Sequence, residues 1–208
     1  MIEFLNSTAL TMFGAPTTWA EVVGFATGAW CVWLVGRQSV WNWPIGIANN
    51  LVWILLFFTA GLFADAGLQI VYIALALWGW YQWVRGDAGA PLAVGSTSRS
   101  EWAVLAGVGI AGTAALTLLL ATATDSTVPF WDALTTALSL LATWGQARKY
   151  WESWLLWIAA DLIYIPLYLH KDLTLTALLY AGFLVLCVRG LLAWRRSGAT
   201  TPALVAAR

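Results

Sequence analysis

Seven long apolar stretches follow one another along the chain, at residues 18–36, 43–62, 66–84, 102–123, 130–147, 154–170 and 174–194. A helix needs about 20 mostly apolar residues to cross the hydrocarbon core of a bilayer. The runs are unbroken, whereas the strands of a transmembrane barrel alternate apolar and polar residues. The pattern therefore predicts an all-α polytopic membrane protein with seven transmembrane helices.

The composition supports this prediction. Hydrophobic residues make up 61% of the 208 residues and charged residues 10%, against roughly 45–50% and about 25% in soluble domains. A soluble fold of this size could not cover so much apolar surface. Ten basic residues balance ten acidic ones, so the chain carries no charge pattern for nucleic acid. Cys31 and Cys187 lie in apolar runs and predict neither a disulfide nor a metal site.

The basic residues predict the orientation. With the N-terminus outside, nine of the ten Lys and Arg residues fall on the inside and only Lys171 falls outside. Such an excess is typical of cytoplasmic loops, so we expect an N-out/C-in protein of the cell membrane. Residues 1–16 have no basic region and no small-residue cleavage site, so we expect a short outside lead-in and not a signal peptide. We expect the Gly-, Pro- and Ser-rich residues 87–100 to be a cytoplasmic linker and residues 197–208 a cytoplasmic tail.

The chain matches itself without gaps when it is shifted by 111 residues, a shift that we call the repeat offset. It brings together the identical pairs Trp33/Trp144, Arg37/Arg148, Trp43/Trp154, Gly79/Gly190, Trp83/Trp194 and Arg85/Arg196. The matching segments hold three predicted spans each, and one further span separates them. This predicts two parallel three-helix repeats, 17–86 and 128–196, joined by a central helix at 101–124. A 3+1+3 duplication is typical of transporters, with the substrate site between the repeats.

Polar and aromatic side chains inside the spans are the candidate site, because such groups are costly in hydrocarbon. Trp157, Asp161 and Tyr164 share one helical face. The candidate substrate-binding residues are Asn50, Trp53, Gln69, Tyr72, Trp157, Asp161, Tyr164 and Tyr180. Two such faces would form an aromatic cage for a flat hydrogen-bonding ring, and the Asp161 carboxylate would favour a cationic one.

Structural roles compete with this interpretation. Tryptophans near span ends predict a belt at the membrane interface, at positions 19, 41, 43, 83, 131, 151 and 194. Glu21 and Asp132 fall in first helical turns, where the helix dipole favours acids. Asn50 and Asp161 could instead form hydrogen bonds between helices. A polar stripe on span 130–147 could equally serve close helix packing; it comprises Thr135, Ser139, Thr143 and Gln146.

Catalysis is not indicated. His170 is the only histidine, and no nucleophile and base are recognisable around it. The sequence has no H-E-x-x-H motif and no phosphate loop. We therefore expect no enzyme, no cofactor and no metal, and leave a non-transporting membrane scaffold as an alternative.

Two segments, Trp43–Trp83 and Pro129–Trp194, resemble the two repeats of the nicotinamide riboside transporter family, PnuC. The most specific part is Q-A-R-K-Y-W-E-S-W-L-L-W at 146–157, followed by Asp161. The resemblance implies a seven-helix 3+1+3 fold like that of the sugar-transporting SWEET proteins, and a homotrimer. It also implies import of nicotinamide riboside by facilitated diffusion, with trapping by a separate cytoplasmic kinase.

Family site positions match Trp157, Asp161 and Tyr164 best, followed by Asn50, Trp53, Gln69 and Tyr72. Relatives in the same superfamily carry riboflavin or thiamine, and a single carboxylate would also permit a proton-coupled carrier. The substrate and the coupling therefore stay open at this point.

Overall fold

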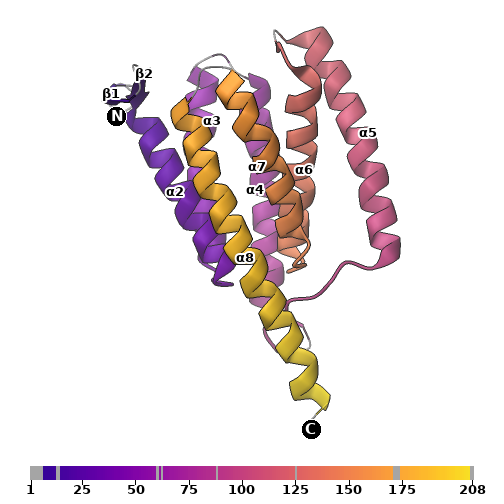
Figure 1. Ribbon diagram of the computed structural model, residues 1–208. Coiled ribbons are helices and arrows are strands. Elements are labelled where there is room, and N and C mark those ends of the chain that lie inside the picture. Colours follow the sequence, from indigo (N-terminus) through magenta and orange to yellow (C-terminus); the bar gives the residue numbers. More distant parts are fainter. Residues whose placement is uncertain are drawn as a thin grey trace.

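The computed structural model describes residues 7–12, 15–59, 61, 63–87, 89–124, 126–170 and 174–206. Within this part of the chain a two-stranded hairpin precedes seven helices (Figure 1). The helices are α2 (Trp19–Gly36), α3 (Asn42–Thr59), α4 (Phe63–Arg85), α5 (Arg99–Ala123), α6 (Pro129–Ala147), α7 (Ser153–His170) and α8 (Thr174–Ala206). Each helix overlaps one predicted span. Lys171, Arg208 and the side chain of Glu21, which entered the sequence predictions, lie outside the described residues.

Both ends of the chain carry more structure than the apolar pattern predicts. The expected lead-in contains the antiparallel strands β1 (Thr8–Met12) and β2 (Ala15–Thr18). The amide of Trp19 donates to the carbonyl of Ser7 at 3.2 Å, which ties this hairpin to the start of α2. At the other end, α8 continues to Ala206, through most of the predicted tail.

The helices differ in apolar character. Among the described residues, α5, α7 and residues 176–199 of α8 are long and apolar enough to cross a membrane, and 22–36 and 42–58 are shorter apolar helices. Helix α6 is less apolar because it turns polar side chains into the bundle: Thr135, Ser139 and Gln146 are buried. A helix that packs its polar face inward does not need a continuous apolar run.

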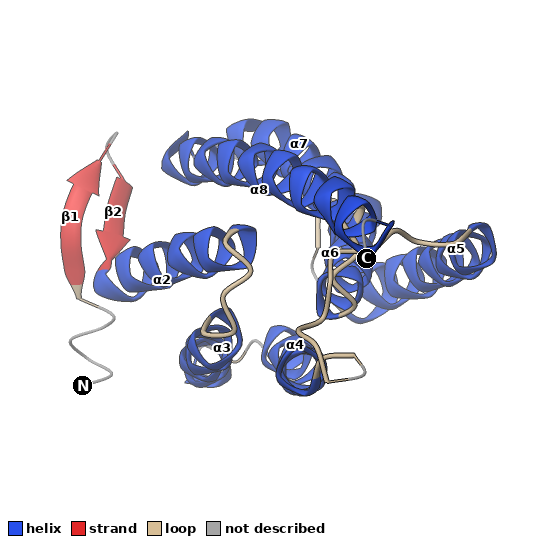
Figure 2. Cartoon of the chain, turned by 90° about the horizontal axis from the view of Figure 1, so that it is seen from below, coloured by secondary structure: helices blue, strands red, loops and turns tan. Residues whose placement is uncertain are grey.

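Helices α2, α3 and α4 form one group and α6, α7 and α8 another, with α5 at the edge of the bundle beside α6 (Figure 2). Within the groups, α3 contacts α2 and α4, and α7 contacts α6 and α8. The most extensive contacts between the groups are those of α2 with α8 and of α4 with α6. Helices α2 and α6, which begin the two groups, run in the same direction (Figure 1).

Positions related by the repeat offset make the same interactions in the two groups. The indole N–H of Trp83 donates to the carbonyl of Gln146 at 3.0 Å, and that of Trp194 donates to the carbonyl of Val35 at the same distance. Each bond crosses from one group to the other. Because the repeat offset relates the two donors and also the two acceptors, the two bonds are equivalent.

The turns after α2 and α6 also correspond. Gln38 and Lys149, which the repeat offset relates, adopt positive φ angles of 56° and 54°. Arg37 lies over the ring of Trp33 at 5.0 Å, and its counterpart Arg148 lies over Trp144 at 5.8 Å. The two halves therefore share local backbone geometry and not only residue identities.

Four tryptophans form an aromatic core inside the bundle, where the two helix groups meet. The ring centroids of Trp43 and Trp83 are 5.4 Å apart and those of Trp154 and Trp194 5.5 Å, both edge to face. Trp83 and Trp194 join the two pairs at 6.0 Å. We call these four rings the tryptophan core.

The tryptophan core corrects one sequence prediction. The belt prediction included Trp43, Trp83 and Trp194, yet they are only 4%, 4% and 0% exposed, so the prediction is wrong for these three. The physical reason is that the rings pack against each other and against glycines, and that two of them donate hydrogen bonds inside the bundle. Trp19, Trp41 and Trp131 are exposed, as a belt requires.

Candidate substrate-binding site

A cavity of about 530 Å³ lies between the two helix groups and adjoins the tryptophan core, of which Trp43 and Trp154 are part of its lining. Seven of the eight predicted site residues line it: Asn50, Trp53, Gln69, Tyr72, Trp157, Asp161 and Tyr180. Tyr164 is not in the lining. Its ring stacks on Tyr168 at 5.6 Å and lies 4.7 Å from Tyr180, so it supports two rings that do line the cavity.

The stacked aromatic pairs at the cavity correspond to one another at the repeat offset. Trp53 and Phe57 of α3 stack at 5.4 Å with an interplanar angle of 27°. Their counterparts on α7, Tyr164 and Tyr168, stack at 5.6 Å and 17°. Stacked rings on both sides of a cavity favour a flat aromatic ligand.

Asp161 supplies a carboxyl group to the cavity. Its side chain is 4% exposed and lies close to the thiol of Cys187. Within the described part of the chain, Asp161 Oδ2 and the indole nitrogen of Trp157 have no hydrogen-bond partner. Leaving a buried polar group unpaired costs about 1–3 kcal/mol. The pair therefore offers an acceptor and a donor that a polar ligand or water would satisfy.

Several polar lining residues were not among the predicted eight. Asn42, Asn49, Thr143 and Gln146 line the cavity, as does Cys31. Two signals in the sequence could have found some of them. Asn49 directly precedes Asn50, and Thr143 and Gln146 belong to the polar stripe.

The stripe on α6 divides into two parts. The Thr135 hydroxyl donates to the carbonyl of Trp131 at 2.9 Å, and neither Thr135 nor Ser139 is in the cavity lining. Thr143 and Gln146, nearer the tryptophan core, line the cavity. One part of the stripe therefore packs within the bundle and the other part faces the cavity.

A larger groove of about 850 Å³ lies between α5 and α6. Its lining is almost entirely apolar, and in the described structure the lining includes no charged or amide side chain. The Thr117 hydroxyl on this lining donates within its own helix, to the carbonyl of Thr113 at 2.7 Å. This groove offers a polar solute little to bind, so the smaller cavity is the better candidate for a substrate site.

Comparison with known proteins gives the family. Residues 18–196 match the family model described as nicotinamide mononucleotide transporter. The riboflavin/roseoflavin transporter RibM of Streptomyces davaonensis is 32% identical, over 93% of this chain and 92% of that protein. The nicotinamide riboside transporter PnuC of Escherichia coli is 25% identical, over 88% of both chains.

Among solved structures, the crystal structure of the vitamin B3 transporter PnuC has a similar fold. The TM-score is 0.70 at 22% identity, covering 88% of this chain and 83% of that chain. The matching proteins are transporters and not enzymes. The chain therefore belongs to the PnuC family of transporters and is a multi-pass protein of the cell membrane that carries a small vitamin-type molecule.

Proposed function

We propose that the chain imports, by facilitated diffusion, a vitamin or vitamin precursor that joins a flat nitrogen heterocycle to a sugar or sugar alcohol. The observation that carries this proposal is the cavity between the two helix groups, with stacked aromatic pairs and the buried Asp161 carboxyl. The rings would hold the heterocycle, and the amides of Asn50 and Gln69 would bind hydroxyl groups.

Nicotinamide riboside is the first candidate substrate. Its pyridinium ring is flat and positively charged, and aromatic faces with a nearby carboxylate attract such a cation. Asp161 is the only acidic residue in the lining of the cavity as the structure describes it. Trp157, on the same helix face, would place its indole N–H next to the carboxamide.

Riboflavin is the second candidate, favoured by a specific observation. The riboflavin/roseoflavin transporter is more similar to this chain, at 32% identity, than the Escherichia coli nicotinamide riboside transporter, at 25%. Riboflavin carries a neutral ring. The two candidates therefore differ in their need for the charge of Asp161.

Binding to purified protein would test the proposal. Nicotinamide riboside, riboflavin and thiamine are titrated in parallel by calorimetry, against wild type, Asp161→Asn and the control Asp132→Asn. Asp132 accepts a hydrogen bond from Ser126 at 2.6 Å and is not in the cavity lining. If the riboside is the substrate, Asp161→Asn weakens its binding by roughly ten-fold or more, whereas the control changes little.

Each outcome has a clear meaning. Riboflavin binding that survives Asp161→Asn would replace the first candidate by the second. Binding of thiamine alone would refute the sugar or sugar-alcohol part of the proposal, because thiamine has neither, and would make thiamine the substrate. Failure of wild type to bind any of the three would refute the proposed substrate class.

We further propose the 3+1+3 architecture, with repeats at 17–86 and 128–196, the central helix at 101–124 and an N-out/C-in orientation. The linker at 87–100 and the tail at 197–208 would then be cytoplasmic. The two equivalent indole hydrogen bonds, from Trp83 and Trp194, support the repeats. Arg37, Arg85 and Arg148 lie at or just after the ends of α2, α4 and α6, which point to the same end of the bundle (Figure 1).

Alternating access would follow from rocking one three-helix unit against the other. Uptake into proteoliposomes should stop at equal concentrations inside and outside, because nothing drives accumulation. A cytoplasmic kinase that phosphorylates the substrate would trap it in the cell. Uptake that follows an imposed pH gradient and collapses with an uncoupler would instead establish proton coupling.

We propose a homotrimer as the assembly. Helix α5 lies at the edge of the bundle and exposes apolar side chains such as Val104, Val108, Ile110 and Leu118. Native mass spectrometry in detergent would show a mass three times that of the chain. A monomer under conditions that preserve substrate binding would contradict the trimer.

A further inference from the structure

The first observation concerns Gly24, a buried residue of α2 that lines the cavity beneath Trp53. A Cβ atom added to Gly24 would lie 2.5 Å from Trp53 Cζ2 and 3.0 Å from Cε2. Real Cβ contacts are ordinary only beyond 3.4 Å. The indole can lie against α2 in its present position only because residue 24 has no side chain.

Gly28, one turn further along α2, provides a contrast. It also lines the cavity, but an added Cβ would meet only Phe183, at 3.5 Å. The two glycines thus sit on one helix face in similar surroundings. Only Gly24 fixes the position of an aromatic wall.

We infer that Gly24 is a specificity-determining residue: it positions the Trp53–Phe57 wall and so sets the width of the ring-binding part of the cavity. This inference rests on the proposed function. Gly24→Ala pushes the indole away from α2. A three-ring ligand such as riboflavin and a one-ring ligand such as nicotinamide riboside need different widths, so the ratio of their affinities changes.

The test measures dissociation constants of both ligands for Gly24→Ala, with Gly28→Ala as the matched control. We expect the affinity ratio to change by roughly ten-fold or more, as for a methylene-sized change in a pocket, and Gly28→Ala to leave it unaltered. A second substitution, Trp53→Phe, removes the larger ring and should return the ratio of Gly24→Ala toward wild type. A purely structural defect would lower the affinity for both ligands together and leave their ratio unchanged.

Failure of the inference is distinguishable from failure of the proposed function. If wild type binds neither ligand, the proposed function is wrong. If wild type binds and folded Gly24→Ala keeps the same ratio, or Gly28→Ala shifts it equally, Gly24 does not determine specificity.

An independent observation concerns residues 91–98, which we call the strap and which cross the end of the bundle below the tryptophan core. The amide of Gly95 donates to the carbonyl of Lys149 at 3.1 Å, and the amide of Trp151 donates to the carbonyl of Gly95 at 3.2 Å. The amide of Thr97 donates to Glu152 at 3.0 Å. The strap is therefore fastened along the loop between α6 and α7.

Lys149 joins three parts of the molecule at this point. Its ammonium donates to the strap carbonyl of Leu92 at 2.9 Å and to Gln38 of the first helix group at 3.4 Å. It also lies 4.5 Å from the centre of the Trp83 ring. The side chain is 6% exposed, and this burial lowers the pKa of Lys149.

The strap also covers the tryptophan core. Val94 is buried in the same cluster as Trp43, Trp83, Trp154 and Trp194. Trp43 and Trp154 in turn line the cavity. The strap and the tryptophan core thus form successive layers between the cavity and this end of the bundle.

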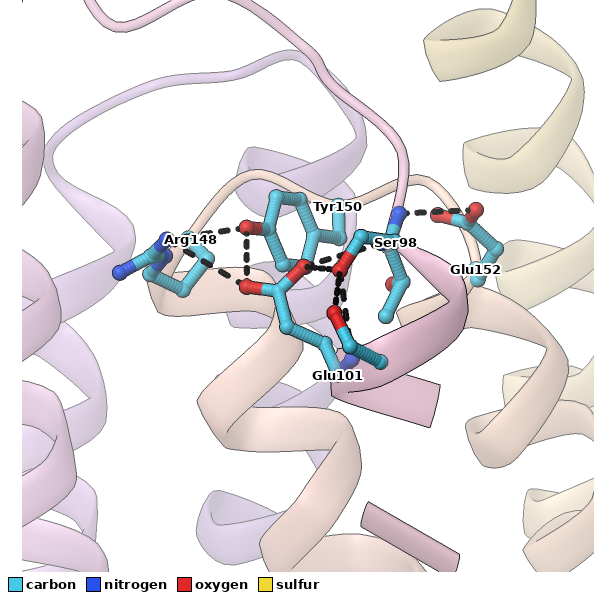
Figure 3. A network of polar contacts seen from close by, with 7 residues as sticks. Ser98, Glu101, Arg148, Tyr150 and Glu152 are labelled. Carbon is cyan, nitrogen blue, oxygen red and sulfur yellow. Dashed lines mark hydrogen bonds and ion pairs between the residues drawn. The ribbon is translucent and has the colours of Figure 1, made fainter. Parts of the chain in front are cut away.

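A polar network at the start of α5 holds the end of the strap (Figure 3). Ser98 and Glu101 form a capping box, and the Tyr150 hydroxyl donates to Glu101 at 2.9 Å. Arg148 lies 3.6 Å from the same carboxylate. The network ties α5 to the loop that carries the strap.

We propose that the strap is a gate: docked, it closes the exit from the cavity at this end of the bundle, and it must leave the loop at 149–152 and α8 for substrate to pass. A disulfide can test this directly. Val94 Cβ lies 3.9 Å from a Cβ placed on Gly198 of α8, within the range of about 3.5–4.5 Å typical of disulfides.

The experiment compares the double variant Val94→Cys/Gly198→Cys with both single variants in proteoliposomes. Oxidation should abolish transport by the double variant but leave ligand binding from the opposite face, and reduction should restore transport. The single variants should transport under both conditions. Full transport by the oxidised double variant, with cross-linking verified by mass spectrometry, would overturn the gate; loss of binding together with transport would indicate general damage and would also overturn it.

Discussion

Glycines 79 and 190 hold the tryptophan core together and allow its packing to be tested. A Cβ added at Gly79 would overlap Trp43 Cη2, and one added at Gly190 would lie 2.5 Å from Trp154 Cη2. Both tryptophans are buried and contact a second tryptophan, so neither ring can retreat freely. We expect Gly79→Ala and Gly190→Ala each to lower the free energy of unfolding by about 1–3 kcal/mol, the usual cost of overpacking a core.

Thermal unfolding in detergent measures this effect. For a chain of this size about 1 kcal/mol corresponds to a shift of roughly 2–4 °C in Tm. The controls are Gly112→Ala and Gly182→Ala, where the described structure has no atom within 4 Å of the added Cβ. Alanine is the better helix former, by up to about 1 kcal/mol, so the controls should be as stable as wild type or more so.

Two outcomes would refute the packing argument. The first is a pair of core variants as stable as the two controls. The second is a large difference between Gly79→Ala and Gly190→Ala, because the two positions have equivalent surroundings.

The remaining predictions concern the interfaces between the helix groups. Trp83→Phe and Trp194→Phe each remove one buried indole donor. The acceptor carbonyls of Gln146 and Val35 keep the backbone N–H bonds from Lys149 and Gln38, so each variant should lose about 0.5–1.5 kcal/mol, the net contribution of one hydrogen bond. Chemical denaturation should give similar losses for the two variants, and no loss would contradict the cross-group bonds. Burial lowers the pKa of Lys149 in the folded chain. The unfolded chain then binds this proton more tightly, so stability should rise with pH between the lowered pKa and 10.5. Lys149→Met should remove that rise in a series of Tm measurements, and an unchanged rise would assign it to another group.

The helices could be predicted because a bilayer demands long apolar runs, and seven such runs are visible in the sequence. Their ends were harder to predict. The last apolar run stops at Trp194 and predicts a helix end there, but residues 195–206 continue α8 without needing an apolar environment. The hairpin before α2 could not be predicted in this way, because its short strands do not have to form a long apolar run.

The position of a tryptophan could not be predicted from its distance to a span end. Trp41 and Trp43 are close neighbours in the sequence and both fit a membrane belt, yet Trp41 is exposed and Trp43 buried. The difference lies in what the ring packs against. Trp43 packs against Gly79 of α4, where the absence of a side chain leaves room for the indole. The sequence does show both glycines of the core as repeat-related identities, but not which side chain each one accommodates.

Most candidate site residues lie around one cavity because helical periodicity defines a face, and the repeat predicts that two such faces meet. Periodicity does not give the exact rotation of a helix. Tyr164 therefore falls just behind Tyr168 and Tyr180, while Asn49, the neighbour of Asn50, reaches the lining. To predict that Thr143 and Gln146 line the cavity, one would have to know at which level along α6 the cavity lies.

The two halves of the chain have identical residues in and around the tryptophan core and different residues in the cavity lining. Tryptophans and glycines of the core recur unchanged at the repeat offset. Asn50, Gln69 and Ala76, all in the cavity lining, correspond instead to Asp161, Tyr180 and Cys187. Packing one half against the other requires the same contacts twice, so identical residues are expected around the tryptophan core. A substrate with a ring at one end and hydroxyl groups at the other has no such symmetry. The proposed substrate is better served by two unlike walls, and the carboxyl group of Asp161 on one of them would fix its orientation in the cavity.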